Sequence, residues 1–245
     1  MRRSRERMDR STPGAFWIAL CGLFQLILCG SVRGSAGVST HGASAVCSTS
    51  GLGAGAKRVV LVHGIYNSGR YMGNMKRLLE RRGWRVYAVS LRPNDASISF
   101  EAMAGQLDAF VRENIPSDAK FDLVGFSMGG LVCRYYIQRM GGYERVRRFV
   151  TLSTPNHGTI WAWLSGRTGV KQMRPGSELL RELNTDPGKL APLEYTSIYT
   201  PMDLTILPPD SSRMSVARNV VSWVPFHALM VWMPGPLRAV EQALE

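Results

Sequence analysis

The stretch "FDLVGFSMGGLVCRYYIQ", residues 121–138, joins an apolar run to an amphipathic one through a serine set among glycines. Residues 121–126 predict a buried strand, because a short apolar run of this kind is typical of a strand covered on both faces. Residues 128–140 carry apolar side chains at helical spacing and predict a helix. Ser127 therefore falls at a strand-to-helix junction, where a Gly-x-Ser-x-Gly spacing exposes a nucleophile.

Gly125 and Gly129 flank this serine. We expect glycine at both positions because a side chain at either would collide where strand and helix pack closely together. Ser127 has a second interpretation, as a cap that accepts a hydrogen bond from the first turn of its helix. The choice between nucleophile and cap depends on the partners elsewhere in the chain.

The rest of the chain from Lys57 alternates short β-branched runs with amphipathic segments. The runs are 58–64, 85–91, 121–126, 147–154, 195–200 and 218–224, and the segments are 69–82, 98–114, 128–140 and 234–245. This alternation predicts one α/β domain over 57–245, with about six mostly parallel strands and helices on both faces. Residues 155–194 exceed a plain crossover, so we expect either a lid-like insertion at the site or a surface excursion without a role.

The first 36 residues predict an export signal. Five arginines within the first ten residues precede an uncharged, largely apolar stretch from Ser11 to Val32, which is the pattern of a secretory signal peptide. The stretch is also about long enough to span a bilayer uncut, so a signal anchor is a second interpretation. Residues 37–56, rich in Gly, Ser and Ala, predict a flexible linker. We expect an exported protein, secreted or periplasmic, with membrane association if the signal stays uncut.

The composition is that of a basic globular protein. Lys and Arg exceed Asp and Glu by 12, but the arginines are scattered and no nucleic-acid-binding motif accompanies them, so no nucleic-acid partner is expected. Cys133 lies on the helix predicted after the serine, where a small buried core residue is expected. The cysteines and histidines show no zinc-type spacing, and no metal is expected.

A serine becomes a nucleophile only when a base takes its proton and donors stabilise the oxyanion that develops. The Met128 amide, at the start of the helix, would supply one donor. The second should come from a loop after an early strand, and "LVHGIYNSG" at 61–69 places the Ile65 amide there. His63 precedes the serine in the chain, so we expect it to orient this loop.

The base is sought among four histidines. In hydrolases built on this serine turn the chain order is serine, acid, histidine, and His227 follows the last predicted strand. His157 lies in "STPNHGT", where shaping the turn or lining the pocket is expected, and His41 lies in the linker.

The acid has to follow a strand between the serine and His227, where it holds the imidazole tautomer. Asp203, after the fifth predicted strand, fits this place best. Asp186 precedes that strand and Asp210 lies several residues beyond it, and both remain alternatives.

In this order the motifs resemble lipases and esterases of the α/β-hydrolase superfamily, and the chain is similar to compact secreted bacterial lipases of the Bacillus lipase A type. The resemblance rests on "VHGIYNSG", "GFSMGG", "TLSTPNHG", "YTSIYTPMD" and "RNVVSWVPFHALM". It implies cleavage of carboxylic esters, lipid acyl esters included, without a cofactor. Ser127, Asp203 and His227 would form the triad, and the Ile65 and Met128 amides the oxyanion hole.

Two departures from the compact lipases stand out. Their serine motif begins with alanine where this chain has Gly125, and residues 159–194 form a longer segment than in the most minimal members. Lipase and esterase therefore both remain open. The partner expected is a lipid or a small ester substrate, and the sequence leaves the oligomeric state open.

Two other functions fit the same residues. An acyltransferase would use the same acyl-enzyme and pass the acyl group to another alcohol instead of water. A hydrolase-like chain without activity would act as a chaperone or binding protein, although the complete candidate triad argues against this.

Overall fold

The computed structural model describes residues 57–245, and the export signal and linker predicted for 1–36 and 37–56 lie outside them. Six strands form one sheet in the order β2-β1-β3-β4-β5-β6, with every neighbouring pair parallel. The strands are β1 (Arg58–Val62), β2 (Arg85–Val89), β3 (Phe121–Phe126), β4 (Val146–Leu152), β5 (Glu194–Tyr199) and β6 (Arg218–Val221). The predicted α/β-hydrolase architecture is confirmed.

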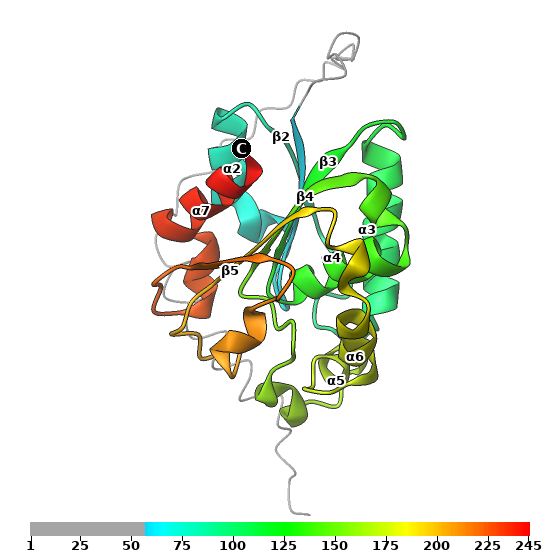
Figure 1. The fold of residues 1–245 in the computed structure, drawn as a ribbon, viewed down its shortest axis with the longest axis vertical. Helices are drawn as coiled ribbons and strands as arrows, with labels where there is room; N and C mark the ends of the chain where they lie inside the picture. Colours follow the sequence, from blue (N-terminus) through cyan, green and yellow to red (C-terminus); the bar gives the residue numbers. More distant parts are fainter. Residues whose placement is uncertain (1–56) are drawn as a thin grey trace, which may run out of the picture. The chain divides into compact units, whose positions relative to one another are not determined.

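Helices cover both faces of the sheet (Figure 1). Helices α3 (Phe100–Asn114) and α4 (Met128–Arg139) pack on one face, and α2 (Gly73–Arg81) and α7 (Pro234–Leu244) on the other. Strand β1 shows why: Val60 and Val62 join the apolar cluster under α3 and α4, whereas Val59 and Leu61 join the cluster under α2 and α7. Side chains of a strand alternate between faces, so a strand buried on both sides has to be apolar throughout.

Short helices fill the connections between the strands. These are η1 (Gly69–Met72), η2 (Gly142–Glu144), η3 (Ile160–Leu164), α5 (Thr168–Gln172), α6 (Glu178–Thr185), η4 (Pro187–Lys189), η5 (Pro209–Ser212) and η6 (His227–Val231). The single helix predicted over 69–82 is a 3₁₀ turn followed by α2, and the insertion predicted over 155–194 holds four of the short helices. Within residues 57–245, no helix combines the length and apolar character needed to cross a membrane.

The strand order fixes where a site can form. Strand β1 lies between β2 and β3, so the winding of the sheet reverses between β1 and β3. Loops leaving the carboxyl ends of strands at such a reversal diverge to opposite faces and leave a crevice in which open α/β sheets bind ligands. The loop with Ile65 follows β1 and Ser127 follows β3, so both lie at this reversal.

Candidate active site

Ser127 forms a strained turn between β3 and α4. Its backbone has φ 52° and ψ −124°, and its side chain makes no capping hydrogen bond, so the interpretation as a helix cap is wrong. The Ser127 amide donates to the Leu152 carbonyl at 2.8 Å, and its carbonyl accepts from the Gly130 amide at 3.0 Å. Positive φ at a non-glycine residue is unfavourable and persists when its surroundings hold it, as these bonds do here.

The glycines around Ser127 permit this turn. A Cβ on Gly125 would lie 2.5 Å from Gly130 Cα, and one on Gly129 would lie 2.5 Å from the Val62 carbonyl oxygen. Both obstacles are backbone atoms, which cannot rotate aside as a side chain would. The predicted collisions are confirmed, and the Gly129 collision involves the end of β1.

The loop after β1 lies against the serine. A Cβ on Gly64 would lie 3.1 Å from Ser127 Cβ, so the Ile65 amide follows a residue in contact with the candidate nucleophile. Neither the Ile65 nor the Met128 amide donates to another group within the described residues. Both amides are therefore available to an oxyanion formed at Ser127.

His63 connects this loop to the segment after β2 through two hydrogen bonds. Its Nε2 accepts a hydrogen bond from the Leu91 amide at 2.9 Å, so Nδ1 carries the proton and donates to the Gly64 carbonyl at 2.7 Å. Burial lowers the pKa of His63 and keeps the ring neutral, although the Gly64 bond opposes this. This arrangement agrees with the loop-orienting role expected from its position before the serine.

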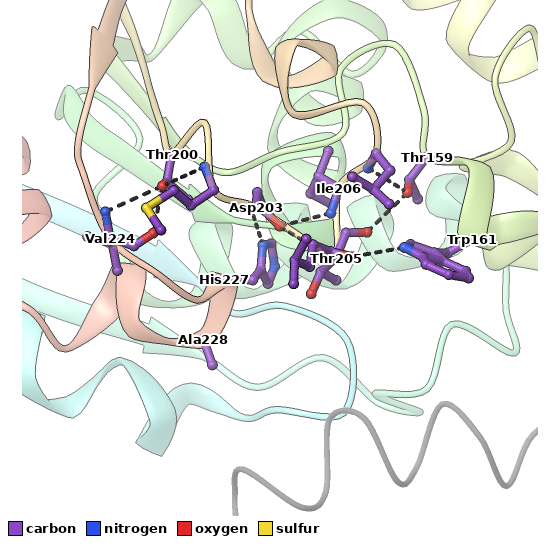
Figure 2. Close-up of polar contacts among 12 residues, drawn as sticks. Thr159, Trp161, Thr200, Asp203, Thr205, Ile206, Val224, His227 and Ala228 are labelled. Carbon is purple, nitrogen blue, oxygen red and sulfur yellow. Dashed lines mark hydrogen bonds and ion pairs between the residues drawn. The ribbon is translucent and has the colours of Figure 1, made fainter.

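Asp203 and His227 form a hydrogen-bonded pair (Figure 2). His227 Nδ1 lies 2.7 Å from Asp203 Oδ2, while Asp203 Oδ1 accepts from the Thr205 and Ile206 amides at 2.9 Å each. Burial of this 1% exposed side chain would by itself raise the pKa of Asp203. His227 and the two amides outweigh burial, so the pKa lies below its ordinary value and the carboxyl is ionised at neutral pH.

The His227 ring packs against Phe126, the residue before Ser127. The Phe126 and His227 rings lie 4.9 Å apart between centroids, and Phe126 directly precedes Ser127. Ser127 and His227 form no direct hydrogen bond in the described part of the chain. Contacts between a nucleophile and its base are often looser before a substrate binds, so the arrangement is compatible with proton transfer between them.

Two threonines that sequence reasoning missed hold the loops of Asp203 and His227 in place (Figure 2). Thr200, at the end of β5, donates to the Val224 carbonyl at 2.6 Å, which ties the Asp203 loop to the His227 loop. Thr159 donates to the Thr205 carbonyl at 3.0 Å and accepts from the Leu207 amide at 3.1 Å. No local motif marks a threonine for such a role.

The insertion adds a further contact to the acid loop. Trp161 Nε1 donates to the Leu204 carbonyl at 2.8 Å, directly beside Asp203. Trp163, two residues on, is exposed and lies under the Arg174 guanidinium at 4.6 Å. The start of the insertion is thus fixed to the loop that carries the acid.

The rival acids lie elsewhere. Asp186 is exposed and accepts from the Gly188 amide at 3.3 Å, and exposed Asp210 faces Arg213 at 3.9 Å. His157 lies 3.1 Å from the Arg213 carbonyl oxygen and 3.2 Å from the Asn184 amide nitrogen, as expected for a residue that shapes its turn. Asp203 is therefore the carboxylate that the structure pairs with His227.

No cluster of three or more metal-ligating His, Cys, Asp or Glu side chains forms within residues 57–245. Cys133 is a free cysteine buried in the core, as expected.

Comparison with solved structures shows the same fold. A lipase from Bacillus licheniformis in its mature form matches with 18% identity over 78% of this chain and 93% of its own, at a TM-score of 0.63. Aspergillus fumigatus lipase B matches with 20% identity over 78% of this chain and 52% of its own, at a TM-score of 0.67. A variant of polyneuridine aldehyde esterase matches with 20% identity over 77% of this chain and 97% of its own, at a TM-score of 0.53.

The sequence itself matches the family described as palmitoyl protein thioesterase. The match covers residues 58–183, just over half of the chain. It includes Ile65 and Ser127 but ends before Asp203 and His227, so the pairing of acid and base rests on the geometry described above. By this match the chain belongs to the palmitoyl protein thioesterase family, and its fold is that of the α/β-hydrolases.

Proposed function

We propose that this protein is a serine hydrolase that cleaves fatty acyl esters, thioesters among them, through an acyl-enzyme on Ser127. The observation that carries the proposal is the Asp203–His227 hydrogen bond, made to a buried carboxylate, with His227 packed on Phe126, the residue before the strained turn at Ser127. A carboxylate that fixes a histidine next to a serine is the arrangement that activates a hydroxyl for attack on a carbonyl.

The first half of the reaction forms the acyl-enzyme. His227 Nε2 takes the Ser127 proton as Oγ attacks the carbonyl carbon, and Asp203 stabilises the imidazolium through Nδ1. The oxyanion accepts hydrogen bonds from the Ile65 and Met128 amides, each worth about 3 kcal/mol in such sites. The bond to the leaving alcohol or thiol breaks as His227 returns its proton to that group.

The second half releases the acid. Water gives a proton to His227 and attacks the acyl carbonyl, and the bond to Ser127 Oγ breaks as that proton moves to the serine. The enzyme returns to its starting state, with one water and one ester converted to an acid and an alcohol, or one water and one thioester converted to an acid and a thiol.

The substrate class follows from the surface beside the pair and from the family. Three exposed apolar side chains are sequence neighbours of the pair: Met202 and Leu204 flank Asp203, and Phe226 precedes His227. Exposed apolar surface at a site favours an apolar ligand such as an acyl chain. The family description adds a thioester bond as a candidate target.

The test uses the purified protein with two series of substrates, p-nitrophenyl esters and acyl thioesters, each from acetyl to palmitoyl. We expect turnover in both series, with kcat/KM rising with chain length. Ser127→Ala should lower kcat by at least about 10⁴-fold, while Ser117→Ala, at an exposed loop position, should match the wild type. Undiminished turnover in Ser127→Ala would contradict the proposal, and product transferred to an added alcohol instead of water would identify an acyltransferase.

A further inference from the structure

Three segments that are distant in the sequence meet beside the candidate oxyanion hole. They are the loop after β1 at 64–67, the loop after β2 at 92–98 and the start of α5 in the insertion. Tyr66 lies at their junction and directly follows Ile65, whose amide is the second candidate donor. Its φ is 59°, in the left-handed region that non-glycine residues rarely adopt.

The backbone of Tyr66 is held by the loop after β2. Its amide donates to the Asn94 carbonyl at 2.7 Å, and the Asn94 side chain donates to the Asn67 carbonyl at 2.8 Å. An unfavourable backbone conformation persists when its surroundings over-determine it, and such residues gather at active sites. The Ile65 N–H lies in the preceding peptide unit, whose Gly64 carbonyl is bonded to His63. The turn at Tyr66 holds the following peptide unit, so the two together fix Ile65 from both sides.

The side chain of Tyr66 is held by Arg167 from the insertion. Arg167 Nη1 donates to the Tyr66 hydroxyl at 2.6 Å, and its Nε lies 3.3 Å from Asp95 Oδ2 in the loop after β2. The Gly169 amide, two residues on, donates to the Ala96 carbonyl at 2.9 Å. Arg167 therefore bridges all three segments from a partly exposed position, with 37% of its side chain accessible.

We propose that Arg167 is a positioning residue for the oxyanion hole. Through the Tyr66 hydroxyl and Asp95 it holds the left-handed turn that follows Ile65, and thereby helps to keep the Ile65 amide in place; it also connects the insertion to the loop that carries this amide. An oxyanion donor works only if it is fixed before the reaction at the place where the charge develops. The inference rests on the proposed function, because it assigns a role in the acyl transfer at Ser127.

The kinetic test compares Arg167→Ala, Tyr66→Phe and the double variant on p-nitrophenyl butyrate. Each rate is divided by the number of active sites, which is counted in a separate sample labelled to completion with a fluorophosphonate. Unfolded protein, which takes no label, is thus left out of the rate. We expect kcat to fall about tenfold in each single variant with little change in KM, because a misdirected donor weakens transition-state binding only. The double variant should lose about the same factor as Arg167→Ala alone, because removing Arg167 already removes its bond to the Tyr66 hydroxyl.

A second readout separates positioning from mere structural support. A trifluoromethyl ketone forms an oxyanion on the serine, so its inhibition constant should rise by the factor by which kcat/KM falls. Arg181→Ala is the matched control: it removes the same charge from an exposed side chain of the same insertion, one that donates to the Gly176 carbonyl. This control should keep the wild-type values.

Three results would overturn the inference while the proposed function stands. They are wild-type kcat and inhibitor affinity in both single variants, a rise in KM with unchanged kcat, and fully additive losses in the double variant. If Arg167→Ala does not fold, the kcat and the inhibition constant of Tyr66→Phe test the inference instead, because this variant removes one hydroxyl and keeps the ring. A wild-type protein that neither labels nor hydrolyses would instead remove the proposed function, and this inference with it.

Discussion

The turn at Ser127 and the loops that carry Asp203 and His227 lie at the carboxyl ends of the strands, yet they are held there differently. At the turn, glycines press backbone against backbone, and a Cβ on Gly125 or Gly129 would lie 2.5 Å from a backbone atom. Asp203 and His227 instead lie on loops after β5 and β6, where side-chain hydrogen bonds from Thr159 and Thr200 hold them.

This difference separates two ways of fixing a catalytic group. Close backbone packing leaves Ser127 one conformation, even though that conformation is unfavourable. The acid–base loops depend on individual bonds, each of which a single substitution removes. We therefore expect the turn to tolerate no added volume, and the loops to lose function in steps as bonds are removed.

The largest effect is expected at the acid. Asp203→Asn can still accept from the Thr205 and Ile206 amides, but the carboxamide no longer favours the proton on His227 Nδ1, and kcat should fall by about 10³- to 10⁴-fold. Steady-state kinetics on a p-nitrophenyl ester measures the loss. Asp210→Asn, at an exposed position, is the control, and a loss below about tenfold in Asp203→Asn would count against the assigned acid.

A side chain added at the turn should lower the stability of the fold. In Gly129→Ala the added methyl group meets the Val62 and His63 carbonyl oxygens, and the free energy of unfolding should fall by about 3 kcal/mol. Gly105→Ala is the matched control, since a Cβ there meets nothing within 4 Å on α3 and should stabilise the helix by up to about 1 kcal/mol. Urea denaturation measures the free energy of unfolding of both variants. Equal values for Gly129→Ala and Gly105→Ala would show that the turn accommodates the added methyl group.

Loss of the Thr159 hydroxyl, which bonds the loop of Asp203, should have a smaller effect on activity and stability. Thr159→Val keeps the shape of the side chain but removes the hydroxyl that bonds the Thr205 carbonyl and the Leu207 amide, so stability should fall by about 1 to 2 kcal/mol. The same loosening of Asp203 should lower kcat by about fivefold. Thr185→Val, which removes an exposed hydroxyl bonded to Arg181 on α6, should leave kcat unchanged; equal kcat in both variants would remove Thr159 from the support of the acid.

The smallest effect concerns the pH dependence of stability. The pKa of Asp203 is lower in the folded chain than its ordinary value of 3.8, so the folded state favours the ionised carboxyl. The resulting stability is present above pH 3.8 and is lost as the pH falls through the folded pKa. The difference in unfolding free energy between wild type and Asp203→Asn should therefore shrink below about pH 4. A difference that stays constant down to pH 3 would contradict the pKa shift.

The same contrast decides what could be predicted from sequence. The six strands and the turn at Ser127 follow from local patterns, because periodicity and glycine spacing act over a few residues. The Thr159–Thr205 bond spans 46 residues and the Arg167–Tyr66 bond spans 101, and no spacing rule connects residues so far apart. For the same reason Asp186 and Asp210 remained alternatives until the fold paired Asp203 with His227.

The most direct measurement is the mass of the protein after reaction with a fluorophosphonate, followed by identification of the labelled peptide. We predict one adduct per chain, on Ser127, which is absent from Ser127→Ala and forms much more slowly in His227→Ala because the proposed base is gone. An adduct on another residue, or ester hydrolysis that persists in a protein that takes no label, would contradict an acyl-enzyme on Ser127.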